Sequence, residues 1–242
     1  MSYHAQLARF YAAHGIAVFP VEIAKAANGK FDKRPLVRAW VDAASTDSAQ
    51  IDAWWRQWPN AAVGLPMGRL EAVALDGDIR PDCDGVGNLW KTLTEYGVAL
   101  DKVFWSKTPS GGVHVFYRSP RNELGNSPKG MPPGVDVRGA GGFVVAPGSI
   151  RPDGAAWGCG TPLEVLAPAL CPGGALLPLP EALRARMLAG QAQPKPVAQS
   201  SGPVRSTPAG LARAQEHAKR FVEEAAPGNT NNLFNNLCFH QL

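Results

Sequence analysis

EAVALDGD, residues 71 to 78, is the stretch that decides how the fold is interpreted. Its apolar run predicts a buried strand, and the strand ends in two aspartates, Asp76 and Asp78, one residue apart. Because alternate residues of a strand face the same side of a sheet, both carboxylates are predicted to project together. Two unpartnered carboxylates in such a place repel each other, and a divalent cation removes that cost. Hard oxygen ligands favour Mg²⁺, Mn²⁺ or Ca²⁺ over zinc.

A solvated turn without any ligand is the alternative interpretation of the same residues. A calcium-binding loop between two helices is excluded, because the spacing fails. Counted from Asp76, the sixth position is Pro81 where that loop needs glycine, and the twelfth is Gly87 where it needs glutamate.

A second polar element lies in TPSGGVHVFYR, residues 108 to 118. Gly111 and Gly112 predict a tight turn whose free N–H groups can face an anion, and Ser110 adds a hydroxyl. His114 follows early on the next strand, where its ring can donate to a phosphate oxygen. A histidine with a purely structural role is the alternative.

A third element, GVDVRGAGGFVVAPGS, spans residues 134 to 149. Asp136 and Arg138 are two residues apart, so a carboxylate and a guanidinium are predicted on one face of a strand. The glycines that follow leave room for a ligand or a neighbouring backbone. An ordinary surface ion pair is the alternative here.

The composition is that of a folded protein, with 45% hydrophobic and 18% charged residues in 242. The formal charge of +4 suits a polyanionic partner without requiring one. Positive charge gathers in a predicted basic loop that contains Lys25, Lys30, Lys33, Arg34 and Arg38. A basic loop and an acidic centre together indicate a site for a phosphate-bearing ligand and a metal, with a solvated surface loop as the alternative.

Hydrophobic periodicity predicts an α+β fold with a mixed or antiparallel sheet flanked by helices. The predicted helices span residues 3–14, about 48–58 and about 86–97. The tryptophans of the second helix are interpreted as core residues rather than base-stacking platforms. The predicted strands span residues 16–21, 62–65, 71–78, 103–108, 113–118, 135–138 and 142–147.

Composition also divides the chain. Residues 1–189 are predicted to form the catalytic or binding domain, 190–208 a flexible linker rich in Pro, Ser, Gly and Gln, and 209–242 a helical segment that begins a further helical domain. The four cysteines lack zinc-ligand spacing, and neither a signal peptide nor a membrane span is predicted. We therefore expect a cytoplasmic protein with reduced thiols.

The order of the three elements resembles the archaeo-eukaryotic primase superfamily, and more narrowly the bifunctional DNA primase/polymerase (prim-pol) domain of plasmids, phages and other mobile elements. The resemblance extends through GIAVFPV, KRPLVRAWVDAASTDSAQIDAWWRQWPNAAVGLPMG, AVALDGD, TPSGGVHVFYR and GVDVRGAGGFVVAPGS, over about residues 5 to 165. It implies the primase catalytic core, whose sheet is similar to that of an RNA-recognition motif, followed by a C-terminal helical appendage. APGS stands here where the family usually has APPS, and Trp157 lies near the place of a frequent tyrosine, which leaves that flank less defined.

The resemblance implies a role for each candidate residue. Asp76, Asp78 and Asp136 would be the catalytic residues that bind Mg²⁺ or Mn²⁺. His114 would contact the triphosphate of the incoming nucleotide, with Ser110 nearby, and Arg138, Lys33 and Arg34 would be further phosphate ligands. The interpretation requires that the three carboxylates converge around the ions with no salt bridge in the space between them.

The implied reaction is template-directed nucleotidyl transfer, in which primers are made or extended from NTPs or dNTPs during replication of a mobile element or phage. Single-stranded DNA and nucleotides are the implied partners, together with a helicase domain or protein, and no membrane. Two alternatives stay open: a replication-associated DNA-binding module without activity, and a metal-dependent glycosyltransferase that uses its D-x-D for a nucleotide sugar.

Overall fold

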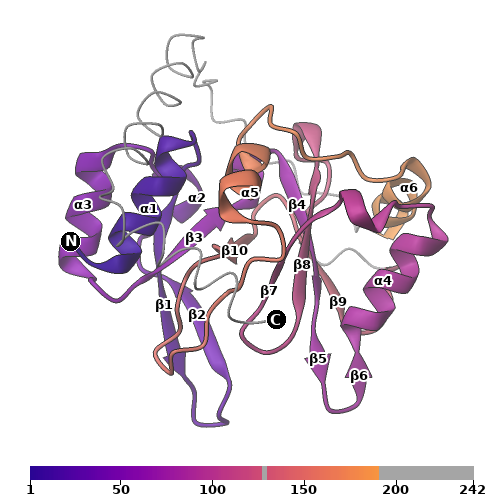
Figure 1. Cartoon of the computed structure of the whole chain (residues 1–242), viewed down its shortest axis with the longest axis horizontal. Helices are drawn as coiled ribbons and strands as arrows, with labels where there is room; N and C mark the ends of the chain where they lie inside the picture. The colour runs from indigo at the N-terminus through magenta and orange to yellow at the C-terminus, as the bar shows by residue number, and fades with distance from the viewer. Residues whose placement is uncertain (127–129, 191–242) are drawn as a thin grey trace.

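The computed structural model describes residues 1–126 and 130–190, and within them the chain folds into two four-stranded antiparallel sheets with helices packed against them (Figure 1). This arrangement confirms the predicted α+β class and the antiparallel pairing. The predicted linker and C-terminal helical segment lie outside the described residues, apart from Gly190. The division of the chain at residue 189 stays a prediction.

The first sheet has the strand order β10-β3-β1-β2. Its strands are β1 (Phe19–Lys25), β2 (Phe31–Pro35), β3 (Ala62–Pro66) and β10 (Phe143–Val145). Helices α1 (Tyr3–Ala13) and α3 (Ser48–Gln57) cover one face of this sheet, and the short helix α2 (Trp40–Ala43) lies between β2 and α3 in the chain. The side chain of Asp47 accepts a hydrogen bond from the Ala49 N–H and so caps the beginning of α3.

The second sheet has the order β7-β8-β4-β9. Its strands are β7 (Phe104–Lys107), β8 (Val113–Arg118), β4 (Ala72–Gly77) and β9 (Val135–Arg138). Helices α4 (Gly85–Glu95) and α6 (Glu181–Gly190) cover one face, while α5 (Leu163–Leu170) packs on the core that the two sheets share. A small hairpin of β5 (Ile79–Arg80) and β6 (Cys83–Asp84) connects β4 to α4.

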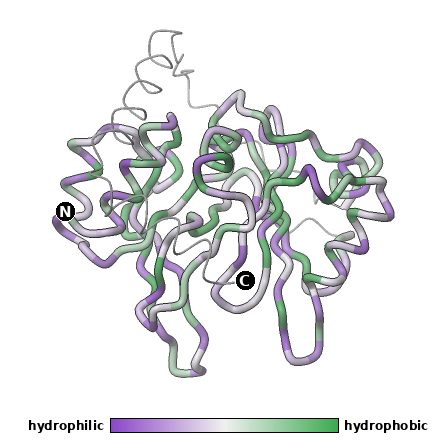
Figure 2. Tube along the Cα trace, in the orientation of Figure 1, coloured by the Kyte–Doolittle hydropathy of each residue, from purple (hydrophilic) through white to green (hydrophobic). Residues whose placement is uncertain are grey.

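Strand β4 is buried on both faces, which explains its continuous apolar sequence. Val73 and Leu75 pack toward α4 and α6, whereas Ala72 and Ala74 pack into the core shared with the first sheet. Figure 2 shows the hydrophobic residues of β4 and β8 as green segments at the centre of the molecule. Because Asp76 continues the second set, its carboxylate lies on the face that looks toward the first sheet.

One local prediction was wrong. The predicted basic loop contains a strand, because Phe31–Pro35 pairs with β1 in an antiparallel hairpin. Backbone pairing with β1 holds these residues in an extended conformation, although their charged side chains are more typical of a loop. The interpretation of the tryptophans as core residues is confirmed for Trp54 and Trp55, which are buried in the main hydrophobic cluster.

Candidate active site

A row of polar side chains crosses the second sheet at one level. Asp76 on β4 lies directly opposite His114 on β8 and directly opposite Asp136 on β9, and Ser106 on β7 lies opposite His114. Directly opposite residues of antiparallel strands have side chains on the same face, with Cβ atoms about 4.5–5.5 Å apart. Three segments remote in the sequence thus bring the predicted residues 76, 114 and 136 together.

Most of this polar row is buried without full hydrogen bonding. Asp76 is 5% exposed, His114 2% and Ser106 0%. Among the described residues, Asp76 Oδ1, His114 Nδ1 and Ser106 Oγ have no hydrogen-bond partner. His114 Nε2 lies 3.5 Å from Asp76 Oδ1, which is too long for a strong hydrogen bond. Each such group costs about 1–3 kcal/mol when nothing satisfies it, so these three atoms are expected to bind water or a ligand.

The imidazole of His114 is held in its neutral form. Burial lowers the pKa of His114 below its ordinary value, Asp76 opposes this shift, and the positive charges of Lys33 and Arg138 add to it. A neutral imidazole donates from one nitrogen and accepts at the other. His114 can therefore donate one hydrogen bond to an anionic ligand from its N–H without first gaining a proton.

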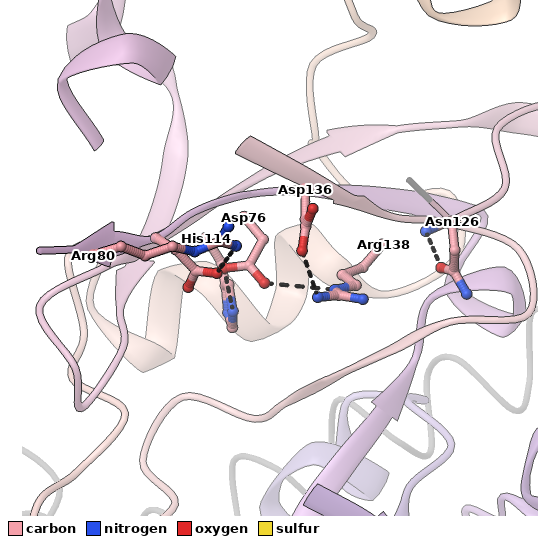
Figure 3. Close-up of polar contacts among 8 residues, drawn as sticks. Asp76, Arg80, His114, Asn126, Asp136 and Arg138 are labelled. Carbon is pink, nitrogen blue, oxygen red and sulfur yellow. Dashed lines mark hydrogen bonds and ion pairs between the residues drawn. The ribbon is translucent and has the colours of Figure 1, made fainter. Parts of the chain in front are cut away.

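Arg138 lies between the two aspartates that face each other across β4 and β9 (Figure 3). Its Nη2 is 3.0 Å from Asp136 Oδ2, and its Nε is 3.5 Å from Asp76 Oδ2. The guanidinium thus supplies the positive charge that the two carboxylates need. This salt bridge occupies the space in which the sequence interpretation placed metal ions.

Asp78 lies one residue beyond the end of β4 at Gly77. Its N–H still donates to the Gly134 carbonyl at 2.9 Å, so the backbone pairing of β4 with the β9 segment continues to Asp78. The Asp78 carboxylate accepts a hydrogen bond from Arg80 Nη2 at 3.1 Å and is about one third exposed. Within the described part of the chain, no three His, Cys, Asp or Glu side chains are grouped to hold a metal ion. The side-chain cage of three carboxylates is therefore not formed in this structure.

The polar row opens into a cavity of about 300 Å³ to which both sheets contribute. Asp76, His114 and Arg138 come from the second sheet, and the remaining lining includes Lys33 on β2, Trp40, Asn126 and residues Gly141 to Val145. Trp40 and Phe143 form an aromatic wall, with ring centroids 5.2 Å apart in an edge-to-face arrangement. A cavity with convergent charged groups beside an aromatic wall is typical of a site for a charged, ring-containing ligand.

The other predicted phosphate ligands separate into two groups. Lys33 lines the cavity, with its Nζ 5.7 Å from the centroid of the Trp157 ring. Arg34 points to the opposite face of the hairpin and forms an ion pair with Glu22 at 2.6 Å. Ser110 is exposed in the turn between β7 and β8 and does not line the cavity. Of the residues predicted to bind phosphate, His114, Lys33 and Arg138 therefore line the cavity, and Ser110 and Arg34 do not.

The predicted tight turn is present, but its donors are partly used. Gly111 has a φ of +84°, and its N–H donates to the carbonyl of Thr108. A Cβ on Gly112 would lie 2.5 Å from the carbonyl oxygen of Gly77, so this position needs glycine for close packing against β4. The turn therefore fixes β8 beside β4, which sets the register of His114 opposite Asp76.

Four lining or supporting residues were missed from the sequence. The alternation in FWSK places Ser106 and Phe104 on the face of β7 that continues the polar row, and pairing of β7 with β8 could have identified Ser106. Trp40, Asn126 and Phe143 carry no local signal, because only the packing of the two sheets brings them to the cavity.

Two carboxylates of the kind that Mg²⁺ and Mn²⁺ prefer nevertheless face each other across β4 and β9. Asp76 Oδ1 is buried and lacks a hydrogen-bond partner among the described residues. Because the Arg138 guanidinium contacts both Asp76 and Asp136, a metal ion would have to replace at least one of these contacts.

Comparison with known proteins gives one family. Residues 8–174 match the model described as "Bifunctional DNA primase/polymerase, N-terminal", which covers more than half of the chain and includes every side chain of the polar row. No curated protein matches the chain. Within the described residues, no helix has the length and apolar character needed to cross a bilayer.

Proposed function

Because the chain belongs to the bifunctional DNA primase/polymerase family, we propose that the cavity beside Asp76 carries out template-directed nucleotidyl transfer. A 3′-hydroxyl attacks the α-phosphate of an NTP or dNTP, a new phosphodiester bond forms, and pyrophosphate leaves. The hydroxyl of a free nucleotide makes the reaction priming, and the hydroxyl of a primer makes it extension. In this proposal the two sheets are the archaeo-eukaryotic primase core, acting in replication of a plasmid, phage or other mobile element.

The observation that carries the proposal is the polar row beside two cationic side chains. His114 and Asp76 present buried atoms without partners, while Lys33 and Arg138 line the same cavity. A triphosphate provides the negative charge and the acceptor oxygens that such a set would bind. In our proposal His114 donates to a phosphate oxygen, and Lys33 and Arg138 neutralise the phosphate charge.

Asp76 and Asp136 are the proposed ligands of Mg²⁺ or Mn²⁺. When bound, the ions lower the pKa of the attacking hydroxyl and neutralise charge on the leaving pyrophosphate. Asp78 is proposed as a further ligand, because the one ion pair that it forms with a described residue is the exposed pair with Arg80, and such pairs contribute about 0–1 kcal/mol. In this proposal Arg138 holds the carboxylates of Asp76 and Asp136 in place until a metal cation or a phosphate group replaces one of its contacts.

The aromatic wall suits the uncharged part of a nucleotide. Phe143 lies on β10 of the first sheet, Trp40 lies on α2 and packs against that sheet, and both line the cavity together with the polar row of the second sheet. Aromatic side chains bind bases through their π-faces with little sequence preference, at about 1–3 kcal/mol per stacked base. A nucleotide could thus place its base or sugar against the first sheet and its triphosphate against the second.

A DNA-binding module without activity is the second candidate, and the Arg138 salt bridge is the observation that favours it. If the Arg138 guanidinium stayed between Asp76 and Asp136, it would neutralise their negative charge as a metal ion does, but it would not catalyse a reaction. No observation favours a glycosyltransferase, because the family that the chain matches is that of bifunctional DNA primases/polymerases.

A primer-extension and priming assay with labelled dNTPs and NTPs, in Mg²⁺ and in Mn²⁺, tests the proposal. Asp76→Ala/Asp78→Ala and Asp136→Ala should abolish incorporation while leaving the circular dichroism spectrum unchanged. Asp82→Ala is the matched control, because Asp82 is an exposed aspartate of the neighbouring β5–β6 turn. Full activity in the double variant would refute the site assignment, and DNA binding without incorporation by the wild type would favour the inactive module.

A further inference from the structure

The hairpin of β1 and β2 separates its charges onto two faces. In the register of the pair, Val21, Ile23 and Lys25 lie opposite Pro35, Lys33 and Phe31. Glu22 and Ala24 lie opposite Arg34 and Asp32, on the other side. Since directly opposite residues share a face, both acidic residues of the two strands lie with Arg34, and Lys25 and Lys33 share a face that has no acidic residue from either strand.

This lysine face runs outward from the cavity. Lys33 lines the cavity itself, and Lys25 is its diagonal neighbour across the hairpin, about 7–8 Å away between Cα atoms. Lys30 follows in the turn beyond Lys25, and all three lysines are exposed. Figure 1 shows the hairpin projecting from the edge of the first sheet, away from helices α1 and α3.

Aromatic surface accompanies the charges. Phe31 is partly exposed between Lys33 and Lys25, and the guanidinium carbon of Arg151 lies 4.1 Å from the centroid of its ring. Arg151 is also paired with Asp153 at 2.6 Å, so its net contribution to the positive potential is small. Trp157 lies beneath Lys33 but is itself buried. Phe31 is thus the aromatic ring that accompanies the lysines on this face.

We propose that single-stranded DNA follows this face, here called the lysine face, as it leaves the cavity. The inference rests on the proposed function, because a polymerising site needs a strand to enter or leave it. Flexible lysines next to an aromatic ring bind a phosphate backbone without reading its sequence, which suits a template of any sequence. An acidic peptide is disfavoured, because the lysine face continues directly into a cavity built for a nucleotide.

The test compares Lys25→Gln/Lys30→Gln with Arg34→Gln in the full chain. Neither lysine lines the cavity, and Arg34 lies on the same hairpin but on the opposite face. Binding of a fluorescent oligothymidine is measured by anisotropy over a range of salt concentrations. Each lost phosphate contact reduces the slope of log K against log salt by about 0.7, so the double variant should lose about 1.4. Extrapolated from 1 M salt, this corresponds to about 25-fold weaker binding at 0.1 M salt.

Arg34→Gln should change the slope by less than half as much as the double variant. Equal effects of both variants, or no effect of the lysine changes, overturn the assignment of the lysine face. Primer extension at saturating DNA then distinguishes a failure of the lysine-face proposal from a failure of the proposed function. If the wild type incorporates nucleotides while the double variant binds DNA normally, the lysine face does not bind the DNA, and the proposed function still holds. If the wild type neither binds nor incorporates, both fail.

Discussion

Replacing Arg138 by methionine tests whether the guanidinium serves as an internal counter-charge for the active-site carboxylates. The change keeps the length of the side chain but removes the ion pairs to Asp136 and Asp76. At a separation of about 5 Å and an effective dielectric constant of about 20, two carboxylates repel each other by about 3 kcal/mol. Asp136 and Arg138 are each about one third exposed, and solvent reduces the expected loss of stability to about 1–2 kcal/mol.

Thermal unfolding in EDTA and in excess Mg²⁺ or Mn²⁺ measures this effect. For a folded unit of this size the loss corresponds to a decrease in Tm of about 3–6 °C in EDTA. Divalent cation should restore most of the Tm of Arg138→Met, because it replaces the missing positive charge. The wild type should respond less, since its guanidinium competes with the ion for Asp76 and Asp136.

Arg9→Met is the control for this experiment. Arg9 forms an ion pair with Asp52 on the surface between α1 and α3, and its exposure of 37% is close to that of Arg138. Its removal should lower the Tm modestly and by the same amount with and without metal. An unchanged Tm of Arg138→Met in EDTA, or a metal response no larger than that of the wild type, would show that the guanidinium and the ion do not share a place.

Four further outcomes are expected. Burial lowers the pKa of His4 from 6.5 to about 4. The stability that its neutral form contributes is therefore complete above pH 6.5 and is lost as the pH falls toward 4. Urea unfolding should show a decrease of up to about 3 kcal/mol in the free energy of unfolding over this range, and His4→Gln should lack this decrease. His114→Ala should raise the Michaelis constant for dNTPs by about tenfold or more in steady-state kinetics, as expected for the loss of a charge-assisted hydrogen bond. Gly112→Ala should cost about 1–3 kcal/mol in chemical denaturation, because its methyl group meets the carbonyl of Gly77. Ser106→Ala should leave the Tm unchanged or higher in thermal unfolding, since the hydroxyl that it removes has no partner among the described residues.

The sequence predicted the strands well wherever burial controlled the pattern. The run before Asp76 is apolar because β4 is covered on both faces, and alternation correctly placed Asp136 and Arg138 side by side. It could not predict that β4 lies between β8 and β9, because that order is set by the packing of distant segments. Without this strand order, the proximity of Asp76 to His114 and Asp136 could be inferred only from the family resemblance.

The failures have physical causes of the same kind. Alternation predicted that Asp78 projects with Asp76, but it could not predict that the Asp78 carboxylate accepts a hydrogen bond from Arg80. Lys33 and Arg34 were treated as one pair in a loop, whereas pairing with β1 turns one into the cavity and the other away from it. Contacts between side chains and pairing between strands, which sequence patterns do not reveal, decide where these charged side chains point.

The unsatisfied atoms of the polar row bear on the choice between an enzyme and an inactive module. Asp76, His114 and Ser106 each bury a polar atom without a partner, at about 1–3 kcal/mol apiece, against a total stability of about 5–15 kcal/mol for a typical domain. Arg138 relieves the charge on Asp76 Oδ2 but leaves Oδ1 unsatisfied, so the salt bridge does not complete the site. A module that only bound DNA on its surface would gain stability from apolar residues at these positions. A ligand with both positive and acceptor groups, such as the metal-bound nucleotide of the proposed function, would supply the missing contacts of this row.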